Sequence, residues 1–267
     1  MLKESEYIAE GCIFHGLAPR VMGSKLDLVA IGVERESVEP AWNAICSEAE
    51  RLEGMLNSED KDSEIGQFNF GRMLAHSEVS EELGEIIDMC KEYRWRTCEA
   101  FDVALGKMSL VDHDEEDGTL SVYGAKVDFG SFAKGYLMRK VEAMLRDCGV
   151  TCALVNFGNS MFLAIGSHPY GDSWKISLSN PYTRMPVEEI KIKDSTLAFS
   201  CNAPGCSGRV INPKTGEGVE DKVMCVAISA DPLDAKVLST AMMAAGAGNL
   251  EKLKEEFKDT ELNIYNL

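Results

Sequence analysis

The chain has 267 residues, and 45% of them are hydrophobic, which is enough to bury a substantial core in one large domain. Its 44 acidic residues outnumber its 27 basic ones and give a formal net charge of −17. This excess disfavours nucleic acid and anionic membranes as general partners, although it leaves room for a local basic pocket that holds a phosphorylated small molecule.

The absence of apolar targeting segments and the spacing of the cysteines exclude further classes of protein. No run of about 18 apolar residues occurs, and the first 16 residues contain no apolar signal core, so we expect neither membrane insertion nor export, and a cytoplasmic protein as written. The nine cysteines include no CxxC pair, which favours reduced thiols over a disulfide framework or a zinc site. The four histidines are far apart, so a histidine-built metal site is not expected.

The first half of the chain alternates between strand and helix patterns. Residues 25–33 have the pattern of a half-buried strand, and residues 39–57 and 80–101 have apolar residues at helical spacing. The acidic stretch 113–118 is typical of a solvated turn. We expect residues 119–149 to form two short strands, a glycine-bearing turn and a helix that ends near Gly149.

The second half is richer in strands. Residues 152–166 indicate a strand, a Gly-Asn turn and another strand, and further strands are expected within 175–181, 187–200 and 222–230, before helices that begin near 232 and 248. Strands and helices mix without a regular βαβ alternation, so the sequence predicts an α+β fold with mixed sheets and flanking helices. We expect one domain over residues 1–267, with two intertwined subdomains as the alternative.

Two segments have residue types suited to a phosphate. In FGSFAKGY (129–136), Gly130 and Ser131 lie at a strand-to-helix junction, where they serve either a phosphate or only a tight turn capped by Ser131. Asp128 just before them either binds a ribose or ring N–H or caps the same helix. In RVINPKTGEG (209–218), Arg209 either clamps a phosphate or is simply solvated.

A further segment, DPLDAKVLSTAMMAAG (231–246), is either a metal site or an ordinary helix start, and its first residues suit a helix N-terminus. Asp231 is a capping residue, and Pro232 has a preset φ that suits the first turn. Lys236 is the exception, because an ammonium in the first turn opposes the helix dipole.

Taken in order, the segments resemble the FAD:protein FMN transferase family, ApbE, whose members were formerly known as thiamine biosynthesis lipoproteins. The resemblance rests on VMGS (21–24), DSEIGQFN (62–69), AFDVALGKM (100–108), VDFGSFAKGY (127–136), ALVNFGNSMFLAIG (153–166), GDSWKISLSNP (171–181), RVINPKTG (209–216) and LSTAMMAAG (238–246). It covers nearly the whole chain in one consistent order, which makes it far more specific than any single motif.

The resemblance implies a T-fold-like α+β unit that binds FAD and, with Mg²⁺, attaches FMN to a threonine or serine of an acceptor flavoprotein. By position, the FAD site would include Met22, Ala100, Phe101, Asp102 and Asp128, with Lys134 where some members have a cofactor-contacting glutamate. Ser131 and Thr240 would occupy metal-binding hydroxyl positions.

The chain departs from the family pattern at the positions that carry chemistry. Lys236 stands where the family has its metal carboxylate, Arg209 where it has a histidine, and Glu59 where it has an aromatic that stacks on flavin. Asp234 is no substitute ligand, because two residues along a helix rotate a side chain by about 200°. We therefore expect Lys236 and Arg209 to supply fixed positive charge in place of Mg²⁺ and imidazole.

Three hypotheses follow. The protein is an active FMN transferase with an altered site, a catalytically silent flavin-nucleotide-binding relative, or a protein-interaction scaffold that keeps only the fold.

Overall fold

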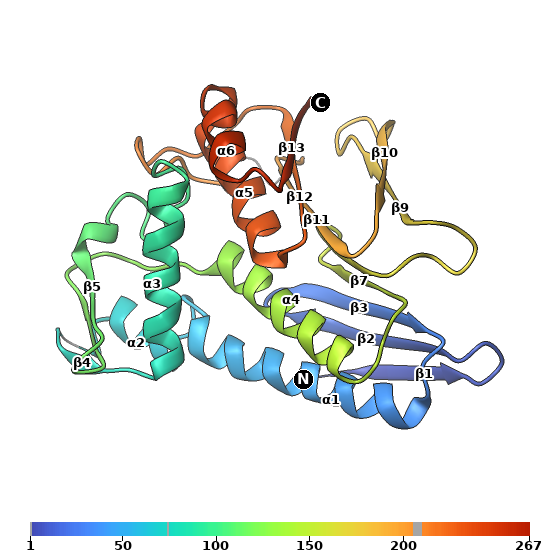
Figure 1. Cartoon of the computed structure of the whole chain (residues 1–267). Coiled ribbons are helices and arrows are strands. Elements are labelled where there is room, and N and C mark those ends of the chain that lie inside the picture. The colour runs from blue at the N-terminus through green and yellow to red at the C-terminus, as the bar shows by residue number, and fades with distance from the viewer. Residues whose placement is uncertain (1, 74, 205–209) are drawn as a thin grey trace.

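The computed structural model describes residues 2–73, 75–204 and 210–267, and within these an eight-stranded antiparallel sheet forms the centre of the fold (Figure 1). Its strands run in the order β1-β2-β3-β7-β8-β11-β12-β13. Their bounds are β1 Glu4–Ile8, β2 Ile13–Val21, β3 Ser24–Ile31, β7 Ala153–Phe157, β8 Met161–Ile165, β11 Ser195–Cys201, β12 Val223–Ser229 and β13 Glu261–Asn266.

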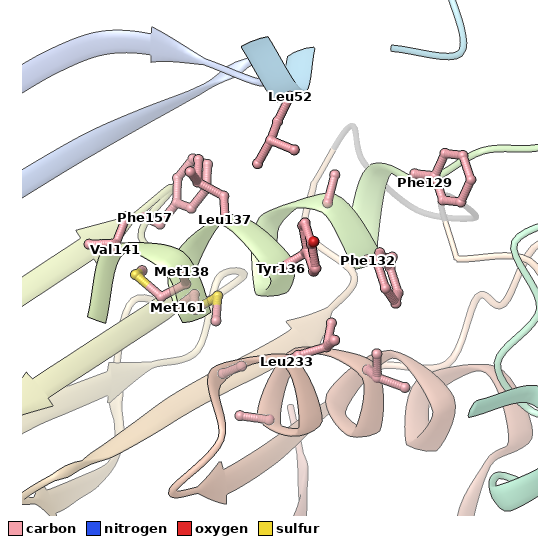
Figure 2. Close-up of a cluster of buried hydrophobic side chains, with 14 of the residues drawn as sticks. Leu52, Phe129, Phe132, Tyr136, Leu137, Met138, Val141, Phe157, Met161 and Leu233 are labelled. Atoms are coloured by element: carbon pink, nitrogen blue, oxygen red, sulfur yellow. The ribbon is translucent and has the colours of Figure 1, made fainter. Parts of the chain in front are cut away.

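Three long helices pack against one another over one face of this sheet: α1 (Arg35–Leu56), α4 (Gly130–Asp147) and α5 (Pro232–Ala245). Trp42 of α1 packs directly on Gly16 of β2, where any Cβ would lie 2.7 Å from the indole ring. In Figure 2, Leu52 of α1 and Leu233 of α5 approach α4 from opposite sides. The central helix α4 is therefore buried among helices as well as against the sheet.

The remaining elements form two smaller sheets and several shorter or flanking helices. Strands β9 (Trp174–Ser179) and β10 (Pro186–Ile192) form a hairpin. Strands β4 (Ser77–Glu78), β6 (Thr119–Val122) and β5 (Val111–Asp114) form a three-stranded sheet. The helical elements outside the long layer are α2 (Glu64–Asn69), α3 (Glu81–Arg96), α6 (Leu250–Glu256) and the 3₁₀ turns η1 (Met108–Leu110) and η2 (Ala247–Asn249).

The β9–β10 hairpin covers the face of the large sheet opposite the helices. Met224 and Val226 of β12 pack with hairpin residues such as Trp174, whereas Cys225 and Ala227 belong to the helix-side core. Because successive side chains of a strand point to opposite faces, the hairpin and the helices lie on opposite sides of the sheet. Among the described helices, none combines the length and the apolarity needed to cross a bilayer.

The predicted α+β class, with sheets and flanking helices, is confirmed, but two local predictions are wrong. Only one strand, β6, lies within 119–129, because hydrogen bonds from other elements fix residues 127 and 128 in place of a strand ladder. The helix predicted to reach residue 101 ends at Arg96, because Cys98 and Glu99 adopt positive φ values of 53° and 65°.

An ion-pair network joins α1, α3 and α4. Arg51 contacts Glu48 and Glu82, and the Lys140 ammonium lies 3.1 Å from Glu48 and 2.8 Å from Glu82. The hydrogen bond from Arg51, followed by the contact with Lys140, lowers the pKa of Glu48 to about 2 from an ordinary value of 4.5. Because the folded pKa is depressed, the stabilisation is present above pH 4.5 and is lost as the pH falls towards 2.

Replacing Glu48 with Gln is expected to lower the free energy of unfolding at neutral pH by about 1–2 kcal/mol, after allowing for solvent screening of the shifted pKa. The difference from the unmodified protein should shrink between pH 4.5 and pH 2. Urea unfolding at several pH values between 2 and 7 measures this difference in free energy. Glu251→Gln, which removes the exposed ion pair with Lys254, is the control. A difference that does not vary with pH would contradict the assigned pKa.

Candidate functional site

The segment just before α4 is held by hydrogen bonds from two other parts of the chain. The Asn69 side chain donates to the Val127 carbonyl at 2.8 Å and accepts from its N–H at 2.9 Å, and the Asp128 N–H donates to Val103 O at 2.7 Å. The Asp128 carboxylate accepts from Gly130 N at 2.8 Å, whereas Ser131 makes no cap. Asp128 thus accepts from the first N–H of α4, although Phe129 is the N-cap residue, and the Asp128 side chain stays exposed.

Helix α2, which ends with Asn69, is itself held in place by a capping bond and a close backbone contact. Ser63 caps it by accepting from Gly66 N at 2.9 Å and donates to the Asn57 carbonyl at 2.6 Å. A Cβ on Gly66 would lie 1.8 Å from the Asp60 carbonyl oxygen, so only glycine fits there. The segment DSEIGQFN (62–69) therefore fixes both the loop before it and the position of Asp128.

Two cavities meet at Asp128 and Gly130, which line both. The first has a volume of about 380 Å³, and the second has a volume of about 100 Å³. The first is lined by Arg20, Met22, Gly23, Glu53, Leu56, Asn57, Ser58, Glu59, Asp128, Gly130 and Ala133. The second is lined by Ala100, Phe101, Asp102, Val103, Leu105, Asp128, Gly130, Ser131, Val210, Ile211, Pro213, Thr240 and Ala244.

All the predicted FAD-site residues other than Lys134 line these cavities, together with the two hydroxyl residues Ser131 and Thr240. Met22 reaches the first cavity from the tight β2–β3 turn, where Met22 and Gly23 have φ values of 46° and 70°. Glu59, at the position of the family's stacking aromatic, lines the same cavity.

The Asp102 carboxylate is already engaged by the protein. It lies 3.0 Å from Arg94 Nε, accepts from Ala104 N at 2.7 Å, and its side chain is fully buried. A ligand in the second cavity would therefore meet the backbone at Asp102 rather than a free carboxylate.

Two lysines come together where α4 and α5 pack. Gly135 permits this approach, because a Cβ there would lie 3.0 Å from Lys236 Cβ and 3.1 Å from Leu233 Cα. Lys134 Nζ donates to Ser24 Oγ at 2.7 Å and lies 5.6 Å from the centre of the Phe157 ring. Burial, and then the nearby Lys134 ammonium, lower the pKa of Lys236 to about 8.

The residues around Thr240 do not fit a Mg²⁺ ion. Mg²⁺ prefers carboxylate and other oxygen ligands, whereas Lys236 is cationic and Thr240 Oγ1 donates to the Lys236 carbonyl at 3.1 Å. Asp234 accepts from the Tyr93 hydroxyl at 2.6 Å, on the α3 side of the helix. No group of three or more His, Cys, Asp or Glu residues suited to a metal occurs in the part of the chain described.

Arg209, the other predicted substitution, lies outside the described residues. Sequence reasoning about this site missed the roles of Asn69, Ser63 and Gly66 in positioning Asp128. Ser63 is of a residue type that caps helices and could have been found by that signal, but the partner of Asn69 is 58 residues away and follows no local pattern.

Comparison with known proteins places the chain in a family. The model of the ApbE family matches residues 22–120 and 108–264, and the chain belongs to this family. The chain is similar to the FAD:protein FMN transferase of Salmonella typhimurium, with 19% identity over 281 residues that cover 89% of this chain and 80% of that protein.

Solved structures show the same fold. The flavin transferase ApbE from Vibrio cholerae matches with a TM-score of 0.78 and 19% identity, over 98% of this chain and 93% of that one. The ApbE protein from Thermotoga maritima matches with a TM-score of 0.81 and 19% identity, over 95% and 96% of the two chains. The fold expected from the resemblance is thus confirmed.

Proposed function

We propose that the protein binds FAD across the two cavities that meet at Asp128 and transfers FMN from it to a threonine or serine of an acceptor flavoprotein. The observation that carries this proposal is the convergence of Met22, Ala100, Phe101, Asp102 and Asp128, which come from three distant segments, on these adjoining cavities. Family membership and the whole-chain likeness to flavin transferases support it.

The reaction is a phosphoryl transfer. The acceptor hydroxyl oxygen attacks the phosphorus on the FMN side of the FAD diphosphate, the bond to the bridging oxygen breaks, AMP leaves, and the hydroxyl proton is released. Such a reaction needs positive charge at the phosphates and a group that takes the proton. Lys236, one helical turn from Thr240 in the lining of the second cavity, would supply the positive charge, whereas a guanidinium at Arg209 has no lone pair to accept a proton.

A catalytically silent flavin-nucleotide-binding relative is the second candidate. It is favoured by the absence of a carboxylate at position 236 and by the misfit of Mg²⁺ among the described residues. Such a protein would bind the nucleotide by charge and leave its diphosphate intact. The scaffold hypothesis predicts instead that no flavin nucleotide binds.

Incubation of the purified protein with FAD and a candidate acceptor flavoprotein, followed by a denaturing gel, separates these candidates. The transferase proposal predicts fluorescent flavin that stays on the acceptor band, and a Thr/Ser→Ala acceptor should remain dark. FAD binding without any labelled acceptor would favour the silent relative, and the lack of FAD binding would favour the scaffold.

A further inference from the structure

Lys236 is a buried cation without a counter-charge among the described residues. Its exposed fraction is 7%, and its ammonium makes no hydrogen bond or ion pair within the part of the chain described. The Lys236 carbonyl, by contrast, accepts from the hydroxyls of both Ser239 and Thr240. A charge buried in this way is costly unless a partner neutralises it.

The groups nearest to Lys236 do not offset its charge. Lys134 has the same sign, and Cys201 lies close by, but burial raises the pKa of the Cys201 thiol, so this group is neutral at pH 7. Asp234, the nearest acid in the sequence, is turned away to Tyr93. The packing of α4 on α5 through Gly135 therefore holds two cations together, and no described acid offsets the charge of Lys236.

This pair of lysines lies one helical turn from residues that line the second cavity. Ser131 and Thr240 line the second cavity, and they lie one helical turn from Lys134 and Lys236 respectively. The FAD of the proposed function has one strongly anionic group, its diphosphate, which bears about one negative charge per phosphate. A lysine ammonium binds phosphate as a point charge.

We propose that Lys236 and Lys134 bind the diphosphate of the flavin nucleotide directly, so that binding needs no divalent cation. This inference rests on the proposed function of the same site and specifies how the site recognises its substrate. The Lys236 ammonium supplies the neutralising charge, and the α4–α5 packing holds it in place before the ligand arrives.

The test is a titration of FAD, followed by fluorescence, in EDTA and in Mg²⁺. The unmodified protein should bind FAD with the same affinity, within about twofold, under both conditions. Lys236→Met should weaken binding in EDTA by about tenfold or more, yet raise the melting temperature of the free protein, because it removes a buried charge that has no counter-charge among the described residues. Lys134→Met, with Lys236 intact, should also weaken binding, and the exposed control Lys258→Met should change neither quantity.

The stability readout distinguishes this role from a merely structural one, because a structural lysine would destabilise the protein when it is removed. Unchanged FAD affinity in both Lys236→Met and Lys134→Met would overturn the inference. Binding by the unmodified protein that disappears in EDTA would also overturn it, while leaving the proposed function standing.

Broadening of the ³¹P NMR signal of inorganic pyrophosphate in EDTA separates the inference from the proposed function. Broadening by the unmodified protein but not by Lys236→Met would support the lysine site even if FAD fails to bind, and in that case only the proposed function falls. If neither FAD nor pyrophosphate binds, both are wrong.

Discussion

Lys236→Asp combined with Arg209→His is expected to make FAD binding dependent on Mg²⁺, so that EDTA weakens it by about tenfold or more. Residue 236 lies one helical turn before Thr240, whose hydroxyl already bonds to the carbonyl of residue 236. A carboxylate at 236 and the Thr240 hydroxyl would therefore share one helix face beside the second cavity. FAD titration with Mg²⁺ or EDTA measures the change, and the acceptor-labelling gel shows whether transfer rises with it.

Two matched variants control this experiment. Lys236→Asn removes the ammonium without adding a negative charge and should not acquire the Mg²⁺ dependence. Asp234→Asn, added to the double variant, should leave the dependence unchanged because Asp234 faces Tyr93. A double variant that binds FAD equally well with and without Mg²⁺ would show that position 236 does not correspond to the family's metal carboxylate.

Gly66→Ala is expected to lower the free energy of unfolding by about 2–4 kcal/mol and to weaken FAD binding. The new Cβ would lie 1.8 Å from the Asp60 carbonyl oxygen and 2.7 Å from Ser63 Oγ. The loop that begins at Asn57, which lines the first cavity, must then move. The Asn69 side chain, which donates to the Val127 carbonyl, must move with it. Urea unfolding and FAD titration measure the two effects.

The matched control for Gly66→Ala is Gly54→Ala. Gly54 lies in helix α1 on the exposed surface, and a Cβ there meets nothing within 4 Å. Alanine should therefore raise the stability by about 0.5–1 kcal/mol through its better helix propensity. If Gly66→Ala behaves like Gly54→Ala, the close approach at Asp60 does not constrain the loop.

Local patterns predicted the long helices and several strands of the chain because their signals need only neighbouring residues. Apolar spacing predicted the body of α1, and the Asp231-Pro232 pair predicted the start of α5, where Asp231 accepts from Leu233 N. The strand expected just before Asp128 does not form. Residues 127 and 128 bond instead to Asn69 and Val103, which are remote in sequence and follow no local pattern.

The sequence by itself determined the resemblance to the family, because the motifs occur in the family's order. It also determined the chemistry of the substitutions, since a lysine at 236 cannot act as a carboxylate in any fold. Only the tertiary structure decided that this lysine is buried, that it lies beside Lys134, and that Asp102 is occupied by Arg94. The physical reason is that burial and neighbouring charge depend on how α4 packs against α5. That packing depends on the absence of a side chain at Gly135, which sequence spacing alone does not reveal.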